Sequence, residues 1–247
     1  MKTLLASAIA FVAVAGITSA SAANLPVKAP PMAPPPPPTW TGCYLGLAAG
    51  FAAGRSEHTA PDSGGVTIAG KFDLSGGGLV GGTVGCNYQV APQWIIGFEG
   101  DFSAIDKKGE AHDLAPLFNV NFEQETKERW FATARGRVGF NTTPDSLVYA
   151  TGGGAFAKFD VDEFNTLNPA FQATDSATLS GWVAGGGVEW RFFGWQNMSV
   201  KFEYLFADFR THTFFNPPIT PGNCGCVRAD VRTTDQILRG GFNWRFY

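Results

Sequence analysis

The sequence has little charge, no basic surplus and no long apolar run after its first residues. Charged residues make up 16% of the 247 residues and the net charge is −3; an average globular chain carries about 25% charge. Without a basic field to attract phosphates, a nucleic-acid partner is excluded. Beyond residue 22, no apolar run approaches the ~20 residues of a membrane helix. If the chain crosses a membrane there, it has to do so with strands.

Histidine is also scarce. His58, His112 and His212 lie far apart, with no spacing typical of a catalytic or metal-binding cluster. We interpret them as solvated side chains of long loops, and we expect no cofactor and no metal. Haem or metal capture by loop residues, and an enzyme acting at the barrel rim, are the alternatives.

The N-terminal part has two segments that do not belong to a folded domain. Residues 1–22 have the features of a signal peptide, with Lys2 before an apolar core and small residues at Ala20-Ser21-Ala22. Residues 23–39 form a proline-rich tail, which cannot join a sheet because proline lacks the amide donor. We interpret the tail as a periplasmic spacer, and we predict one domain over residues 40–247.

Large apolar and charged residues alternate along the extended segments of this domain. Trp94, Ile96 and Phe98, for example, fall on one face of a strand, and Glu99 and Asp101 fall on the other. The predicted strands cover residues 43–54, 75–88, 93–104, 128–141, 146–158, 178–192, 197–209 and 233–246. For residues 147–157 the phase stays open: either Val148, Ala150 and Phe156 or Leu147, Tyr149 and Ala155 face outward.

The connections alternate in length. Short turns are predicted at 90–92, 141–145 and 193–196, and long polar loops at 55–74, 105–127, 159–177 and 210–232. Short periplasmic turns and long external loops are typical of outer-membrane barrels. The sequence therefore predicts an all-β fold, an eight-stranded antiparallel up-and-down transmembrane β-barrel in the outer membrane of a Gram-negative cell.

Aromatic residues gather near the ends of the predicted strands. Such rings settle at the level of lipid headgroups, so we expect two girdles on the outside of the barrel. Their members are Trp40, Phe51, Tyr88, Trp94, Phe102, Trp130, Phe140, Trp182, Trp190, Phe206, Trp244 and Phe246.

Ten ionisable residues share the face opposite to the apolar one, which places them in the lumen. They are Glu99, Asp101, Arg135, Arg137, Glu189, Arg191, Lys201, Glu203, Arg239 and Arg245. An eight-stranded barrel is narrow enough for side chains to fill it, and buried ions are costly unless they are paired. We therefore interpret them as a salt-bridged plug. An ion pathway and a catalytic carboxylate pair are the alternatives.

Four cysteines are present, and an oxidising compartment favours their pairing. If segments 43–54 and 75–88 form a hairpin, Cys43 and Cys86 lie at the same membrane edge and both face outward. Cys224 and Cys226 share a loop, where they could form a strained ring or ligate a metal. Three connectivities are compatible with the sequence.

Several short motifs carry a resemblance to a known family. WTGCYLGLAAGF, IIGFEGDFS, ATARGRVGF, SGWVAGGGVEW and the closing LRGGFNWRFY resemble the small outer-membrane β-barrel proteins of alphaproteobacteria, labelled porin-family or opacity-protein-like. Two features depart from the family pattern. Chains of the family usually finish on an aromatic residue, commonly phenylalanine; here Tyr247 follows Phe246, which shifts the phase of the final residue. Cys43 and Cys86 stand at positions where family members usually have aromatic or apolar residues.

The resemblance implies a non-enzymatic structural barrel that contributes to envelope integrity, with its external loops as the contact surface. The partners it implies are outer-membrane lipids, lipopolysaccharide, the barrel-assembly machinery and, as further options, peptidoglycan or host surfaces. The alternative functions are a narrow porin-like channel for small solutes and the binding of haem or host surfaces through the loops.

Overall fold

The structure is a computed structural model. It describes residues 39–61, 67–112, 122–165, 172–192, 195–214 and 229–246. The predicted signal peptide, the proline-rich tail up to residue 38, and Cys224 and Cys226 lie outside these residues. Within the described ranges, no helix is long and apolar enough to span a bilayer.

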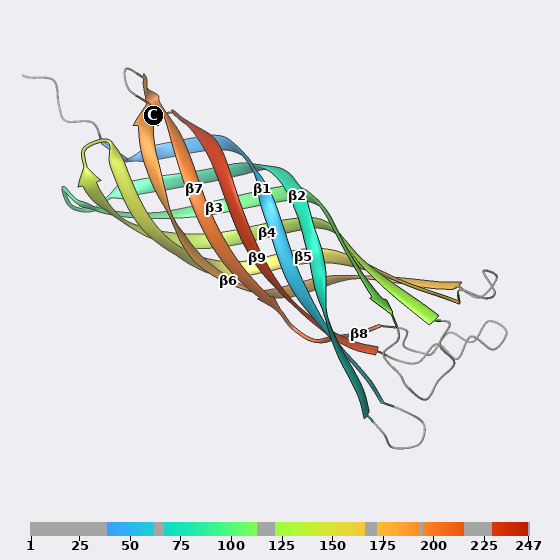
Figure 1. Cartoon of the computed structure of the whole chain (residues 1–247). Helices are drawn as coiled ribbons and strands as arrows, with labels where there is room; N and C mark the ends of the chain where they lie inside the picture. Colours follow the sequence, from blue (N-terminus) through green and yellow to red (C-terminus); the bar gives the residue numbers. More distant parts are fainter. Residues whose placement is uncertain are drawn as a thin grey trace, which may run out of the picture. The chain divides into compact units, whose positions relative to one another are not determined.

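Eight long strands form a closed antiparallel barrel (Figure 1). They are β1 (Gly42–Pro61), β2 (Thr67–Gln89), β3 (Trp94–His112), β4 (Phe122–Thr143), β5 (Ser146–Asn165), β6 (Gln172–Phe192), β7 (Trp195–Phe209) and β9 (Ala229–Phe246). Each strand pairs with the next, and β9 closes the ring by pairing with β1. The short strand β8 (His212–Phe214) adds to the end of β9. The predicted fold class is confirmed.

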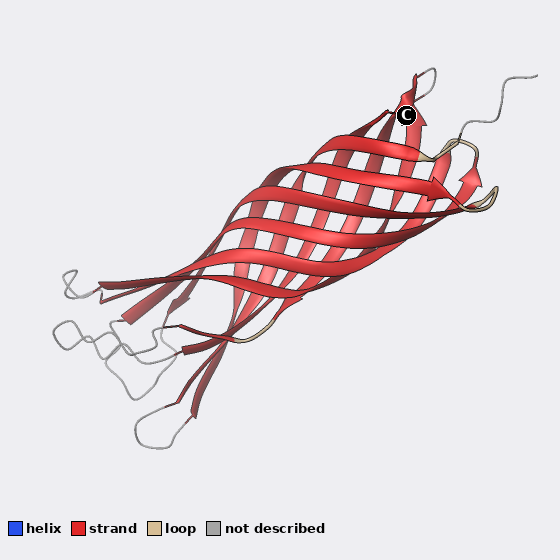
Figure 2. Ribbon diagram, turned by 180° about the vertical axis from the view of Figure 1, so that it is seen from behind, coloured by secondary structure: helices blue, strands red, loops and turns tan. Residues whose placement is uncertain are grey.

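The strands cross the barrel obliquely (Figure 2). Cross-strand partners, followed once around the ring from Asn141 on β4, lead back to the same strand at Phe131, ten residues away. This stagger is the shear of the barrel, and it requires strands tilted by roughly 35–45° to the axis. A barrel of eight strands is narrow, so inward side chains meet across the lumen.

The outer face carries an apolar belt. Its members include Leu45, Leu47, Phe51, Val80, Val84, Phe98, Phe102, Val138, Val148, Phe156, Trp182, Phe202, Leu238, Phe242 and Trp244. In β5, Val148 and Phe156 are exposed, whereas Leu147 and Tyr149 are buried, which decides the phase that the sequence left open. An exposed belt of apolar and aromatic side chains is the surface that a barrel presents to lipid.

The two ends of the barrel differ. At one end, here called the turn end, strands connect through the short turns Val90–Gln93 and Pro144–Asp145. At the opposite end, here called the loop end, the strands extend beyond the belt. There the outer face becomes charged, with cross-strand ion pairs Arg129–Asp160 at 2.7 Å and Arg232–Asp208 at 2.7 Å.

The strands are longer at the loop end than predicted. β3 continues to His112 and β4 begins at Phe122, so the predicted loop at 105–127 was wrong over most of its length. The other three predicted loops are also shortened by extended strands. Polar side chains hold these extensions together; Lys127 Nζ, for example, lies 2.6 Å from Glu125 and 3.1 Å from Asp162.

Candidate functional site

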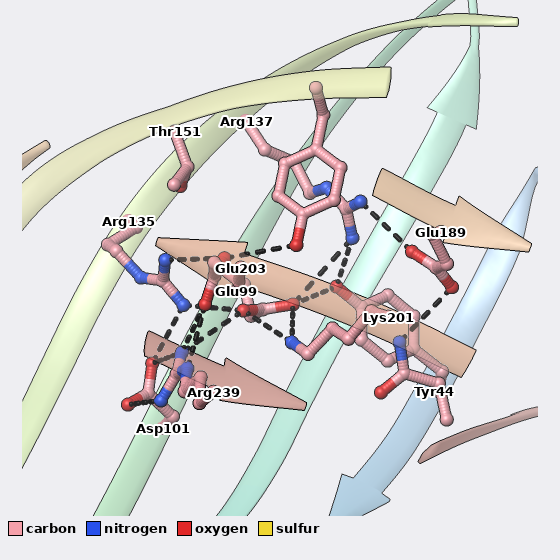
Figure 3. Close-up of polar contacts among 12 residues, drawn as sticks. Tyr44, Glu99, Asp101, Arg135, Arg137, Thr151, Glu189, Lys201, Glu203 and Arg239 are labelled. Atoms are coloured by element: carbon pink, nitrogen blue, oxygen red, sulfur yellow. Dashed lines mark hydrogen bonds and ion pairs between the residues drawn. The ribbon is translucent and has the colours of Figure 1, made fainter. Parts of the chain in front are cut away.

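The lumen is the candidate site, because the strands direct charged side chains into it. All ten residues of the predicted network are inside the barrel, with exposed fractions between 0 and 8%. Their inward position follows from the two-residue period of each strand. Figure 3 shows most of them converging at the centre of the barrel.

Arg135 is the centre of this network. Its guanidinium donates hydrogen bonds to three carboxylates: Glu99 at 2.5 Å, Asp101 at 2.9 Å and Glu203 at 2.9 Å. Arg239 reaches two of the same carboxylates, with 2.8 Å to Asp101 and 2.7 Å to Glu203. Asp101 and Glu203 therefore each accept charge-assisted hydrogen bonds from two guanidiniums, and such bonds are stronger than those between neutral groups.

Nearer the turn end, tyrosines connect the remaining charges. The Tyr44 hydroxyl donates to Glu99 Oε2 at 2.6 Å and accepts from Arg137 Nη1 at 2.8 Å. Arg137 also donates to Glu189 at 3.0 Å and lies 3.9 Å from the centre of the Tyr149 ring. The Tyr44 hydroxyl and the Tyr149 ring therefore add to the carboxylate contact of Arg137, whose Nε has no hydrogen-bond partner among the described residues.

The ten residues comprise six cations and four carboxylates, and two of the cations stand apart from the centre. Arg191 and Arg245 lie at the turn end, where both contact the Trp40 ring. Their guanidinium carbons are 4.3 and 4.7 Å from the ring centre. Cation–π contacts of this kind add to the polar contacts of the two guanidiniums, which include Glu189 Oε1 at 3.5 Å for Arg245 and the Thr39 carbonyl at 2.5 Å for Arg191.

Trp40 closes the turn end of the lumen. Its side chain has no exposed surface and packs with Ile95, Leu147 and Tyr149. Its backbone amide donates to the Gln89 side chain at 3.0 Å. The prediction that Trp40 joins an outer girdle was wrong. Its sequence position has the same parity as the inward-facing Tyr44, and this parity is the signal that could have shown its place.

Beyond the central network, toward the loop end, the lumen is apolar. Sixteen buried hydrophobic side chains pack there, among them Phe131, Phe159, Phe209 and Ile237. They extend the barrel interior into a hydrophobic core of the kind found in soluble β-proteins. This core could not be predicted from the sequence because several of its residues, such as Phe159 and Phe214, fall in segments predicted as loops.

A second charged cluster is buried inside this apolar part. Lys107 Nζ contacts both Glu128, at 2.5 Å, and Asp235, and none of the three side chains has exposed surface. This cluster was not predicted, since Lys107 falls in the predicted loop at 105–127. The continued inward alternation of Ser103 and Ile105 before it is the signal that could have found it.

The three histidines lie on three different strands. His58 was predicted in a loop but is buried on β1, where its Nε2 lies 2.7 Å from Ser56 Oγ. His212 is on β8, and its ring lies 5.0 Å from that of Phe214. His112 ends β3. In the described ranges, no group of three or more His, Cys, Asp or Glu residues is arranged to hold a metal ion.

Cys43 and Cys86 form a disulfide at the turn end. Cys43 on β1 is the direct cross-strand partner of Cys86 on β2, and Cys43 also pairs with Phe246 of β9. The disulfide therefore lies beside the seam at which the barrel closes. The predictions for Cys224 and Cys226 fall outside the described residues.

Chemically, the centre of the lumen is a set of buried ions in which each carboxylate contacts at least one cation. Glu99 and Asp101, the carboxylates that could serve as an acid and a base, are both held by guanidiniums and are 3 and 6% exposed. Trp40 lies on the turn-end side of the network, and the apolar core lies on its loop-end side.

Comparison with known proteins agrees with this architecture. The model of the outer membrane protein beta-barrel domain matches residues 9–246. The 31 kDa outer-membrane immunogenic protein of Brucella melitensis is 33% identical over 200 residues, covering 77% of this chain and 81% of that protein. An uncharacterised protein of Coxiella burnetii is 28% identical over 183 residues, covering 65% and 67% of the two chains. The crystal structure of OprG from Pseudomonas aeruginosa has a TM-score of 0.45 at 12% identity, covering 83% and 97%.

Proposed function

Because the chain belongs to the outer membrane protein β-barrel family and is located in the outer membrane, we propose that it is a non-enzymatic structural barrel with a closed lumen. In this proposal the barrel contributes to the integrity of the envelope. By the rule of short periplasmic turns, the turn end faces the periplasm and the loop end faces outward.

The observation that carries the proposal is the interior of the barrel. Arg135 alone contacts three carboxylates contributed by β3 and β7. A solute would have to separate these pairs, and breaking one buried pair costs about 3–5 kcal/mol. Trp40 and the apolar core add two further barriers in series. Wide aqueous channels need many more strands than eight.

The same interior supports the proposal that the protein is not an enzyme. A catalytic acid or base has to come within hydrogen-bond reach of a substrate. Glu99, Glu189 and Glu203 are 0 to 3% exposed, and each accepts hydrogen bonds from a cationic side chain. Their bonding capacity is taken up by the barrel itself.

We propose outer-membrane lipids, lipopolysaccharide included, as the main partners. The apolar belt suits acyl chains. At its loop-end edge, exposed cations such as Arg129 and Arg232 suit lipid phosphates. The loops would meet the cell's surroundings, including host surfaces, which the name of the immunogenic Brucella relative supports. The barrel-assembly machinery would read the outward-facing Phe246 next to the last residue, and peptidoglycan would be met at the periplasmic end.

Planar-bilayer recording of the refolded protein tests the closed lumen. Heat-modifiable migration on gels first shows that the barrel has folded. We expect no steady openings from the native chain. The control variant carries Glu99→Gln together with Arg135→Gln, which removes the central pair. Discrete openings of the native chain, with a conductance that changes in this variant, would overturn the proposal in favour of a narrow solute channel.

A further inference from the structure

The buried triad of Lys107, Glu128 and Asp235 has more carboxylates than cations. Three strands contribute to it: β3, β4 and β9. Both carboxylates contact the same ammonium nitrogen, and the exposed fraction of all three side chains is zero. With both carboxylates ionised, the cluster would carry a net charge of −1 out of reach of water, which is a costly arrangement.

The surroundings of the triad offer little to balance that charge. On each of the three strands, an inward apolar residue lies near the triad residue: Ile105 precedes Lys107, Phe131 follows Glu128 and Ile237 follows Asp235. The inward side chains of β5, β6 and β7 at this end are apolar as well; they include Phe159, Val161, Leu179 and Phe209. On β1, Gly54 leaves the space that Lys107 and Asp235 occupy, since a Cβ there would lie 2.9 Å from Lys107 Nζ.

The other ionisable groups facing this part of the lumen are already engaged. His58 of β1 bonds Ser56 at 2.7 Å. On the side of the central network, Asp101 and Arg239 pair with each other at 2.8 Å. Among the described residues, Glu128 Oε1 and Asp235 Oδ2 have no hydrogen-bond partner. The buried hydroxyls of Thr126 and Thr233, two residues before Glu128 and Asp235, make no hydrogen bond within the described ranges either, and an uncharged hydroxyl does not neutralise a net charge. The triad itself thus has two carboxylates for a single ammonium.

We propose that this triad holds one proton at neutral pH, on Glu128, and that loss of the proton in alkaline medium loosens the loop end of the barrel. The protonated triad is neutral: one ammonium, one carboxylate and one carboxylic acid. Deprotonation places an unbalanced charge in the apolar core that joins the strand extensions. The loop end, from which the external loops emerge, is then a pH-sensitive part of the molecule, while the belt and central network are not.

The electrostatics of the site agree with this. The triad lies beyond the apolar belt, where neighbouring outward residues such as Asp106, Lys108 and Arg129 are exposed and charged. Burial and the negative charge of Asp235 raise the pKa of the Glu128 carboxyl above its usual range. A raised native-state pKa means that the folded form binds the proton more tightly than the unfolded form. The resulting stability is present at low pH and is lost as the pH rises through the native value.

Limited proteolysis of the refolded, full-length protein tests this, using a protease active over a wide pH range. The strand extensions are the segments to be monitored, with cleavage sites located by mass spectrometry. Comparing Glu128→Gln with the native chain at each pH cancels the pH dependence of the protease itself. We expect the native chain to be cut faster relative to Glu128→Gln as pH rises, by up to about tenfold per pH unit, the limit for one proton.

Two further variants make the result unambiguous. Asp235→Asn leaves one carboxylate for one ammonium, so it should also remove the pH dependence, and it carries the test if Glu128→Gln does not fold. Asp208→Asn is the matched control; Asp208 follows Ala207, the cross-strand partner of Asp235, but faces outward. It should keep the native pH dependence. The proposal is overturned if the ratio of the cleavage rates of the native chain and Glu128→Gln is constant with pH. It is also overturned if Asp208→Asn abolishes the pH dependence as fully as Asp235→Asn does.

Discussion

Lys201 on β7 and Glu99 on β3 lie on opposite walls of the barrel, four strands apart in either direction, and Lys201 Nζ is 2.9 Å from Glu99 Oε2. The lumen is therefore spanned by direct ion pairs. Its charged residues act together across the interior, and the effect of removing one of them depends on how many partners it leaves behind.

Arg135→Gln should be strongly destabilising. It leaves Glu99, Asp101 and Glu203 with one guanidinium fewer in a lumen that water does not reach, and such a loss costs about 3–5 kcal/mol. Urea or thermal unfolding in detergent measures the change. Arg129→Gln, which removes a 58%-exposed side chain of the same strand, is the control and should change the stability much less, because water screens an exposed ion pair. Equal effects of the two substitutions would contradict the view of Arg135 as the centre of the network.

Trp40→Ala should open the turn end. The substitution removes a fully buried ring and leaves Arg191 and Arg245 without their aromatic partner. Truncation of a buried aromatic residue costs about 3–5 kcal/mol. Unfolding midpoints in detergent give the comparison with Trp244→Ala, whose ring is 66% exposed on the belt. A larger loss for Trp244→Ala would show that the lipid-facing ring matters more than the closure.

Replacing the disulfide with Cys43→Ser and Cys86→Ser should lower stability without changing the fold. The bond closes a loop with a sequence separation of 43, for which the chain-entropy model gives a contribution of about 4 kcal/mol. Unfolding of the native chain with and without reductant provides the measurement, and the double variant should match the reduced form. A reductant effect that persists in the double variant would point to Cys224 and Cys226 instead.

The seam between β1 and β9 should be intolerant of added volume. A Cβ on Gly50 would lie 2.6 Å from Arg239 Cα, so Gly50→Ala has to push the two strands apart. Overpacking of this kind costs about 1–3 kcal/mol. Gly78→Ala is the matched control, because a Cβ there meets nothing within 4 Å. The two variants are compared by heat-modifiable migration over a temperature series, and identical melting would refute the close approach at the seam.

The sequence predicted which face of each strand carries the charges, because that depends only on the two-residue period. It could not predict which charges meet. Glu189 and Lys201 are cross-strand neighbours, yet Lys201 contacts Glu99 and Glu189 contacts Arg137. These contacts depend on the diameter and shear of the closed ring, which no single strand encodes.

The ends of the strands could not be predicted from the sequence either. The segment 125–127, for example, has the composition of a solvated loop because all of its residues are polar. It is held as a strand by side chains of the neighbouring strand, such as Asp162, and that neighbour is known only when the pairing is known. Trp40 was predicted on the outer face from its aromatic character, although its parity with Tyr44 indicates an inward position.

The shear of ten residues makes the charge network a means of selecting the register. A slip of one residue between two strands would turn every side chain to the wrong face, so alternation alone opposes it. A slip of two residues keeps each side chain on its proper face, and alternation cannot distinguish it from the native pairing. Such a slip would move Arg239 away from Asp101 and Glu203 together. The ion pairs therefore discriminate between closed barrels that share the same pattern of apolar and polar faces.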